Sequence, residues 1–282
     1  MLVLAAHFYD LLSQLGVDPE TETKTLEYLF SEEKIIFPGY ATLPLEAYIN
    51  QSIFRDLPMR GTFVKTGDLR NALGISAYQL DGTFEKLFLF SEFLLALFNE
   101  MKKSSHIIEP RARAKMEIIK NNIIVFVDKS NHELVDAGKH GFIIVEKNKA
   151  ASQAVESIEN PKTAIEVLEY NHYKLKGDLN QKQKILISLG NYIEPILKDR
   201  AVKAKYADLF SDVSFLLNNF NIRHNNKAGK NAKEFIITAP DATLELWYDR
   251  AYNMILSVIL ANQNFKFSKE LVALKDAHNW NP

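Results

Sequence analysis

The stretch LLNNFNIRHNNK, residues 216–227, is where an amphipathic helical pattern gives way to charged and amide side chains. Ahead of it, apolar residues recur at helical spacing over about four turns. They are Tyr206, Leu209, Phe210, Val213, Leu216, Leu217 and Phe220. Continuing the same spacing places Arg223, His224 and Lys227 on the buried side of the predicted helix.

A guanidinium and an imidazole on a buried face cost free energy unless they are paired, so their position needs a reason. One interpretation is a polar site at the mouth of a helical bundle. The other is that the helix ends near Asn221 and the pair lies in a solvated loop, because asparagine favours helix ends and turns.

The residues around this stretch predict further helices on both sides. Their predicted ranges are 149–158, 160–175, 178–195, with Pro195 as the stop, and a long final helix that opens at Pro240-Asp241. Short connections between successive helices favour antiparallel neighbours. Residues 149–282 are therefore predicted to form an up-and-down helical bundle.

The middle of the chain has a different pattern. A basic helix is predicted over 111–121, and the short β-branched runs NIIVFV (122–127) and FIIV (142–145) predict an antiparallel hairpin. His132 and His140 lie between the runs without the spacing of metal ligands, which indicates surface histidines.

The N-terminal part is predicted to be helical, and the fold class is therefore mainly α with a small central β-hairpin. Predicted helices cover 1–15, 19–30, 45–54 and 84–101. The first lacks the basic start of a signal peptide, so we expect an amphipathic helix there. The predicted domains are 1–105, a connector over 106–148, and the bundle over 149–282.

Residues 68–80, DLRNALGISAYQL, match the spacing of a helix-turn-helix. Leu69, Gly74, Ser76 and Leu80 occupy the positions of its apolar anchors, turn glycine and second-helix cap. The match departs at Arg70, where the motif places a small residue. DNA recognition through 68–81 and a plain helical hairpin are both open, and the first requires exposed Tyr78 and Gln79.

Composition excludes several classes of function. The chain of 282 residues has 47% apolar and 24% charged residues, enough for a real core, and its net charge of -1 excludes a polyelectrolyte binder. It contains no cysteine, which removes disulfides, thiolate catalysis and cysteine-type zinc sites and fits a reducing cytoplasm. No apolar run is long enough to span a bilayer, so no membrane partner is expected.

Sequence motifs of known cofactor and metal enzymes are also missing. The chain contains no GxxxxGK[ST] loop, GxGxxG, HExxH, GxSxG or EF-hand loop, so we predict no cofactor and no metal. The charge is concentrated instead: residues 198–233 hold eight basic side chains against three acidic ones. Because this segment brackets Arg223 and His224, a polyanion site is plausible there.

The Arg-His pair at the end of a bundle helix resembles the HEPN superfamily, helical bundles common in abortive-infection and toxin ribonucleases of bacteria and phages. Those proteins carry an arginine, a polar residue and a histidine four to six places further on. Arg223 and His224 match the first two positions, whereas Ala228, Gly229 and Lys230 stand where the later histidine is found. The resemblance implies an intracellular defence-type protein that acts on RNA, with two subunits meeting through their C-terminal bundles.

Metal-independent cleavage of RNA needs a base, an acid and a cation near the phosphate. We expect His224 to move protons and Arg223 to hold the phosphate, with Asn225 and Asn226 positioning phosphate or ribose. Flanking phosphates would meet Lys227, Lys230 and Lys233. The alternative is a non-catalytic binding module, either the DNA binder described above or a protein-interaction scaffold.

Overall fold

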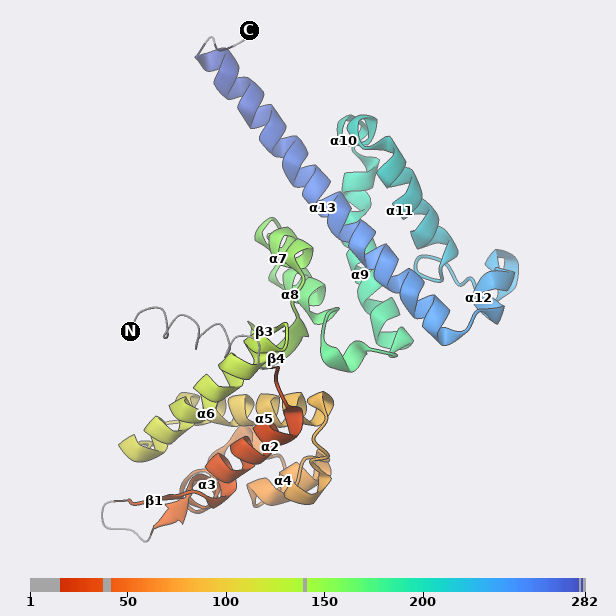
Figure 1. Cartoon of the computed structure of the whole chain (residues 1–282). Coiled ribbons are helices and arrows are strands. Elements are labelled where there is room, and N and C mark those ends of the chain that lie inside the picture. Colours follow the sequence, from red (N-terminus) through yellow and green to blue (C-terminus); the bar gives the residue numbers. More distant parts are fainter. Residues whose placement is uncertain (1–15, 38–41, 139–140, 279, 281–282) are drawn as a thin grey trace, which may run out of the picture. The chain divides into compact units, whose positions relative to one another are not determined.

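The structure is a computed structural model that describes residues 16–37, 42–138, 141–278 and 280. The chain divides into two compact units, Met1–Glu146 (the N-terminal unit) and Lys147–Pro282 (the C-terminal unit) (Figure 1). The helix predicted over 1–15 and the predicted surface residue His140 lie outside the described residues. Between them the units hold mostly helices, so the mainly α fold class with a small β-hairpin is confirmed.

Helix α5 (Phe84–Lys103) supplies much of the core of the N-terminal unit and confirms the helix predicted over 84–101. Its start is fixed by Thr83, whose hydroxyl accepts the Lys86 N–H at 3.3 Å. The elements before it are α2 (Pro19–Glu27), η1 (Tyr28–Glu32), β1 (Lys34–Ile35), β2 (Leu43–Pro44), α3 (Leu45–Ser52), η2 (Phe54–Asp56), η3 (Pro58–Arg60), α4 (Thr66–Ala72) and η4 (Ala77–Gln79).

Helix α6 (Pro110–Lys129) corrects the prediction of a strand over 122–127, because it runs without a break through that segment. Its buried positions Ile119, Ile123, Phe126 and Val127 follow a helical period, and Ile124 and Val125 are exposed. A continuous β-branched run fits a helix of this length as well as a strand.

The β-hairpin itself exists but has a different first strand. Strand β3 (His132–Asp136) pairs antiparallel with β4 (Phe142–Glu146), in a register that sets Leu134 opposite Ile144. The strand predicted over 142–145 is therefore confirmed. Its partner strand has the sequence HELVD. Two acidic residues and a histidine leave this segment without the continuous apolar run that predicts a strand.

Neither alternative for residues 68–80, a helix-turn-helix or a plain helical hairpin, is confirmed, because the second helix is missing. After α4 the chain turns at Gly74, which has a φ of 71°, and forms only the single 3₁₀ turn η4. One turn cannot lie along a major groove as a recognition helix does. Tyr78 is exposed, as DNA recognition would require, but Gln79 is only partly exposed, and both residues lie on the single turn η4.

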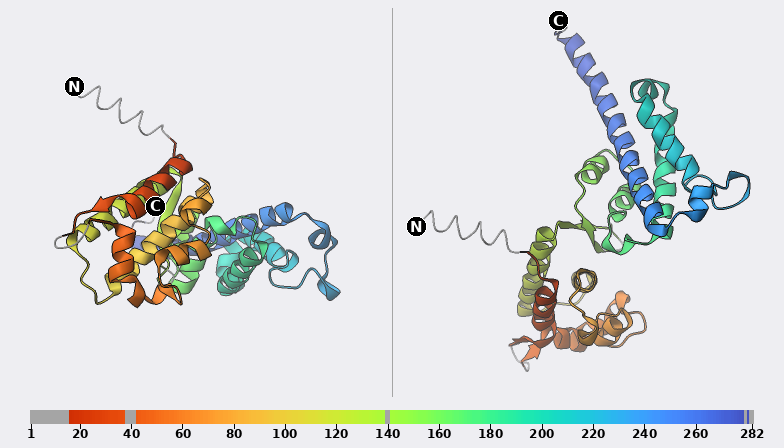
Figure 2. Two further views of the ribbon diagram at one scale, coloured as in Figure 1. Left: turned by 90° about the horizontal axis from the view of Figure 1, so that it is seen from below. Right: turned by 45° about the vertical axis from the view of Figure 1, so that its right-hand side comes forward.

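The C-terminal unit is built on three helices that lie side by side, α9 (Leu179–Lys198), α11 (Ala207–Asn219) and α13 (Asp241–Ala277) (Figures 1 and 2). The shorter elements are α7 (Lys149–Glu156), α8 (Pro161–Glu169), η6 (Tyr173–Leu175), α10 (Arg200–Lys205), η7 (Gly229–Asn231) and α12 (Glu234–Thr238). Gly190 lets α9 approach α11, since a Cβ there would lie 3.2 Å from a methyl of Leu217.

Pro195 does not stop α9 as predicted, because the helix continues to Lys198. The proline lies one turn from the helix end at an exposed position, and its missing N–H removes one backbone hydrogen bond without ending the helix. Within the described residues, no helix is both long enough and apolar enough to cross a membrane.

A buried ion cluster ties α9 to α13. The Lys182 ammonium lies 2.8 Å from a carboxylate oxygen of Glu245 and 2.7 Å from one of Asp249. Tyr170 donates its hydroxyl hydrogen to Asp249 at 2.9 Å, and burial raises the pKa of Tyr170 far above its ordinary value. Lys182 is therefore paired with two carboxylates and acts as a structural residue.

Replacing Lys182 by methionine is expected to lower the free energy of unfolding by about 3 kcal/mol, since two carboxylates would lose their buried counter-ion. Urea denaturation, monitored by tryptophan fluorescence, measures this loss of stability. Both tryptophans, Trp247 and Trp280, lie in the C-terminal unit. The matched control is the exposed neighbour Lys184. Its replacement by methionine should change the free energy of unfolding by less than about 0.5 kcal/mol. Equal stabilities for the two variants would contradict this account.

Candidate functional site

The predicted Arg-His stretch lies beyond the end of α11. The helix ends at Asn219, and Asn221 adopts a left-handed conformation with a φ of 59°. The Arg223 N–H then donates to the Leu217 carbonyl at 2.8 Å, which closes the helix end. The alternative interpretation, a helix that ends near Asn221, is confirmed, and the prediction that the helix carries Arg223, His224 and Lys227 inward is wrong.

Two asparagines hold the loop that follows. The Asn221 N–H donates to Asn226 Oδ1 at 2.7 Å, and the Asn226 N–H donates back to Asn221 Oδ1 at 2.9 Å. The side-chain nitrogen Nδ2 of Asn226 donates to the backbone carbonyl of Asn231 at 2.9 Å. Because Asn226 is buried and engaged on both ends of its side chain, we assign it to the architecture of the loop.

Asn225 has a similar local role on the surface. Its side-chain oxygen accepts the backbone N–H of Lys227 at 3.1 Å and that of Ala228 at 3.2 Å. These bonds form an Asx turn, for which asparagine is well suited. Asn225 and Asn226 thus shape the segment that displays Arg223 and His224.

Arg223 and His224 line one surface pocket of about 550 Å³. The other lining residues come from α9 and from the end of α11: Ile187, Asn191, Glu194, Asn218 and Ile222. Arg223 is half-buried, and its Nη2 atom is buried without a hydrogen-bond partner in the part of the chain that the structure describes. A buried donor without an acceptor is rare and calls for an explanation.

Glu194 adds a carboxylate to this pocket. A hydrogen bond and the positive charge from Lys198, whose Nζ lies 2.7 Å away, lower the pKa of Glu194, and the charge of Arg223 acts in the same direction. The carboxylate is therefore ionised at neutral pH. The pocket brings together a guanidinium, an imidazole and a carboxylate, the set of groups that moves protons around a phosphate.

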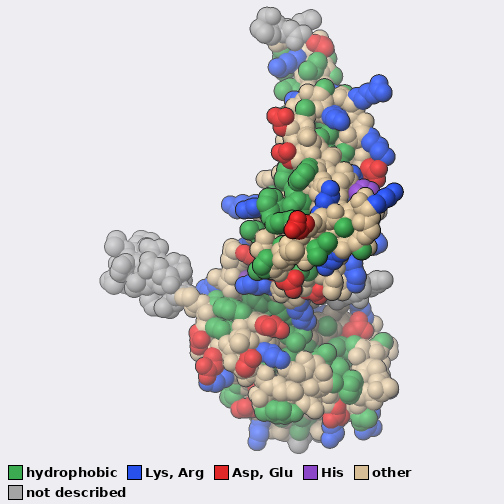
Figure 3. Space-filling view, turned by 90° about the vertical axis from the view of Figure 1, so that its right-hand side faces the viewer, with side chains coloured by type: hydrophobic (Ala, Val, Ile, Leu, Met, Phe, Trp, Pro, Cys, Tyr) green, Lys and Arg blue, Asp and Glu red, His purple; other side chains and the backbone are tan. Residues whose placement is uncertain are grey.

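The three predicted lysines lie on the segment that leads from the pocket to α12. Lys227, Lys230 and Lys233 are all exposed, and none forms an ion pair with any described residue. Figure 3 faces the side of the C-terminal unit that carries α12 and shows a hydrophobic area with both basic and acidic side chains in and around it. These lysines can meet phosphates, but no side-chain contact holds them against the pocket.

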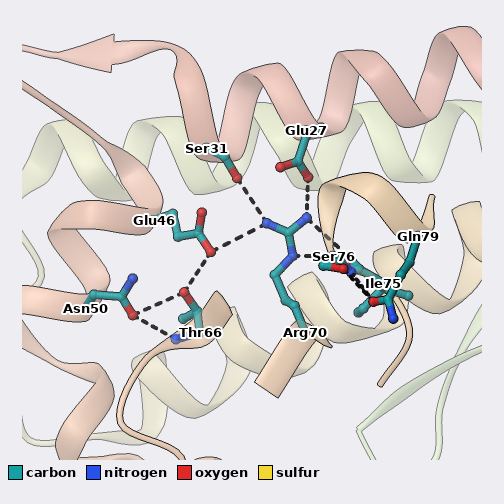
Figure 4. Close-up of polar contacts among 9 residues, drawn as sticks. All are labelled: Glu27, Ser31, Glu46, Asn50, Thr66, Arg70, Ile75, Ser76 and Gln79. Atoms are coloured by element: carbon teal, nitrogen blue, oxygen red, sulfur yellow. Dashed lines mark hydrogen bonds and ion pairs between the residues drawn. The ribbon is translucent and has the colours of Figure 1, made fainter. Parts of the chain in front are cut away.

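The second candidate site, around Arg70, is an interior cluster (Figure 4). Arg70 is only 3% exposed and forms ion pairs with Glu27 and Glu46. Its remaining donors reach the Ser31 hydroxyl at 3.1 Å and the Ile75 carbonyl at 3.2 and 3.1 Å. This guanidinium joins α2, η1, α3 and α4 and has no donor left for a nucleic-acid phosphate.

Comparison of the chain with protein-family models, with curated proteins and with solved structures gives no match. The described residues also contain no cluster of three or more His, Asp or Glu side chains that could hold a metal ion. The function is therefore inferred from the geometry of the pocket around Arg223.

Proposed function

We propose that the C-terminal unit binds RNA and cleaves it without a metal ion in the pocket of Arg223, His224 and Glu194. The observation that carries this proposal is that Arg223, whose buried Nη2 lacks an acceptor among the described residues, lines the same pocket as an imidazole and a carboxylate. A phosphate oxygen would supply that acceptor when the Arg223 side chain turns Nη2 toward the pocket, because a guanidinium binds phosphate through paired N–H donors.

In this mechanism the ionised Glu194 accepts the proton of a ribose 2′-hydroxyl, whose oxygen attacks the adjacent phosphorus. The bond from phosphorus to the 5′-oxygen breaks, and a protonated His224 gives its proton to that leaving oxygen. Arg223 holds the non-bridging oxygens on which charge accumulates. The products are a strand with a 2′,3′-cyclic phosphate and a strand with a free 5′-hydroxyl.

The cellular setting that we propose follows from the HEPN resemblance. An RNA-cleaving bundle of this type would act in the cytoplasm as a defence or toxin protein, and two copies would associate through their C-terminal bundles. The absence of cysteine fits this setting. Growth arrest on expression of the wild-type chain, together with dimerisation in solution, would support the setting.

The test of the proposal is incubation of the purified full chain with labelled single-stranded RNA in excess chelator. We expect cleavage with 2′,3′-cyclic phosphate ends. An oligonucleotide of the same sequence with 2′-deoxyriboses is the control, and it should remain intact because it lacks the attacking hydroxyl. A wild type that is inert, or that cuts the deoxy control equally well, would remove the mechanism.

Replacing Arg223 by alanine is expected to lower kcat/KM for RNA by about a hundredfold, the typical loss for one group that stabilises the transition-state charge. RNA binding should also weaken, because the guanidinium contacts the phosphate before and during the reaction. Single-turnover cleavage and fluorescence anisotropy measure both effects. Arg200→Ala, on an exposed position of α10, is the matched control and should match the wild type.

The stability of the Arg223→Ala variant decides between a functional and a structural role. Since Nη2 makes no hydrogen bond to the described residues, its removal should change the free energy of unfolding by less than about 1 kcal/mol. A loss of several kcal/mol would instead identify Arg223 as part of the structural framework.

A further inference from the structure

A group of aromatic side chains lies beside the lysine-bearing segment of the C-terminal unit. Phe220, at the end of α11, is buried at its centre. Its ring centroid lies 6.3 Å from that of Phe215, 5.9 Å from that of Phe235 and 5.1 Å from that of Trp247. We call these four residues, from α11, α12 and α13, the aromatic face.

Two rings of the aromatic face are open to solvent. Phe215 is 59% exposed and Phe235 is 46% exposed, while the Arg250 guanidinium covers the Trp247 ring at 4.6 Å. Figure 3 shows hydrophobic side chains gathered on this side of the C-terminal unit. Exposed aromatic rings held together by packing indicate a binding surface, because folding alone would favour burying them.

Basic residues lie close to this face in the sequence. The segment 221–233 runs from Phe220 to α12, which begins one residue before Phe235, and it carries Lys227, Lys230 and Lys233. Aromatic rings flanked by cations that lack ion-pair partners are what a single strand of nucleic acid requires. Bases stack on the rings, and the backbone phosphates meet the cations.

We infer that the aromatic face is a base-stacking platform that selects unpaired RNA strands and leads them to the Arg223 pocket. The inference rests on the proposed function, whose substrate it narrows to single strands. Its support is the combination of open Phe215 and Phe235 rings with exposed lysines.

The experiment measures binding of a 12-nucleotide single strand by fluorescence anisotropy, in the His224→Ala background so that no strand is cut. Phe215→Ala and Phe235→Ala are each expected to weaken binding about tenfold, the effect of losing one base–aromatic stack. An abasic oligomer with the same number of phosphates should bind all variants equally. The matched control is Phe267→Ala, a 61% exposed phenylalanine on α13 that lies about 30 Å along the helix from Trp247.

The outcomes separate this inference from the proposed cleavage. A wild type that binds through the rings but cuts nothing would remove the cleavage and leave the platform standing. The platform would be overturned if Phe215→Ala and Phe235→Ala bind the single strand as tightly as the His224→Ala protein that retains both rings. This holds whether or not the wild type cuts RNA. The platform is also overturned if Phe235→Ala abolishes self-association and leaves RNA binding unchanged, since the face would then contact a second copy.

Discussion

Replacing Arg70 by methionine is expected to lower the stability of the N-terminal unit by about 3–5 kcal/mol. Methionine fills a comparable volume, so the loss comes from charge and hydrogen bonding. Glu27 and Glu46 would keep their negative charges in a largely buried place, and the Ile75 carbonyl would lose both of its guanidinium donors. The Phe90 ring, 4.7 Å from the guanidinium, would lose its cation.

The two units allow this loss to be assigned to one part of the chain. Both tryptophans lie in the C-terminal unit, so fluorescence follows that unit alone and far-UV circular dichroism follows both. Arg70→Met should show an early circular dichroism transition in urea, while the fluorescence transition keeps its midpoint. Arg113→Met, an exposed position on α6, is the control. Identical circular dichroism midpoints for the two variants would falsify the interior role of Arg70.

Arg70 also shows what sequence spacing cannot reveal. Residues 68–80 match the helix-turn-helix pattern at its apolar anchors. Arg70 does not match, because the motif places a small residue at that position. Its partners Glu27 and Glu46 lie 43 and 24 positions away in sequence. No periodicity within α4 points to those partners, because they are brought there only by tertiary packing.

The fold class could be predicted because amphipathic periodicity and helix caps dominate the chain. The run 122–127 could not be assigned from its composition, since β-branched residues suit a buried helix face and a strand alike. The flanking residues decide the case: Glu109 caps the helix and Pro110 begins it, and the helix continues to Lys129. A longer window around the run would have favoured the helix.

The candidate site was predictable in part. The asparagine-rich composition of 216–227 indicated both a helix end and a displayed Arg-His pair, and the structure places Arg223 and His224 in one pocket. Glu194 was missed, because it lies on another helix, 29 positions before Arg223. Only the packing of α9 against α11 places its carboxylate in that pocket.

Replacing His224 by alanine is expected to reduce the rate of RNA cleavage by about 10²- to 10⁴-fold, the usual contribution of a positioned general acid or base. In the proposed mechanism the imidazole protonates the leaving 5′-oxygen, and the described residues that line the pocket include no lysine and no second histidine. The affinity for RNA should change little, because Arg223 and the lysines hold the phosphates. Single-turnover cleavage under chelating conditions, with anisotropy on a 2′-deoxy strand, separates the two quantities.

Three comparisons make this prediction specific to proton transfer. His224 is exposed, so the free energy of unfolding of His224→Ala should lie within about 0.5 kcal/mol of the wild-type value. Added imidazole should restore part of the lost rate in His224→Ala, since imidazolium is a small acid that can enter the open pocket and protonate the leaving oxygen. His278→Ala, another exposed histidine of the C-terminal unit, should cleave at the wild-type rate. A His224→Ala variant as active as the wild type would remove His224 from the mechanism, because the leaving oxygen would then receive its proton from another group.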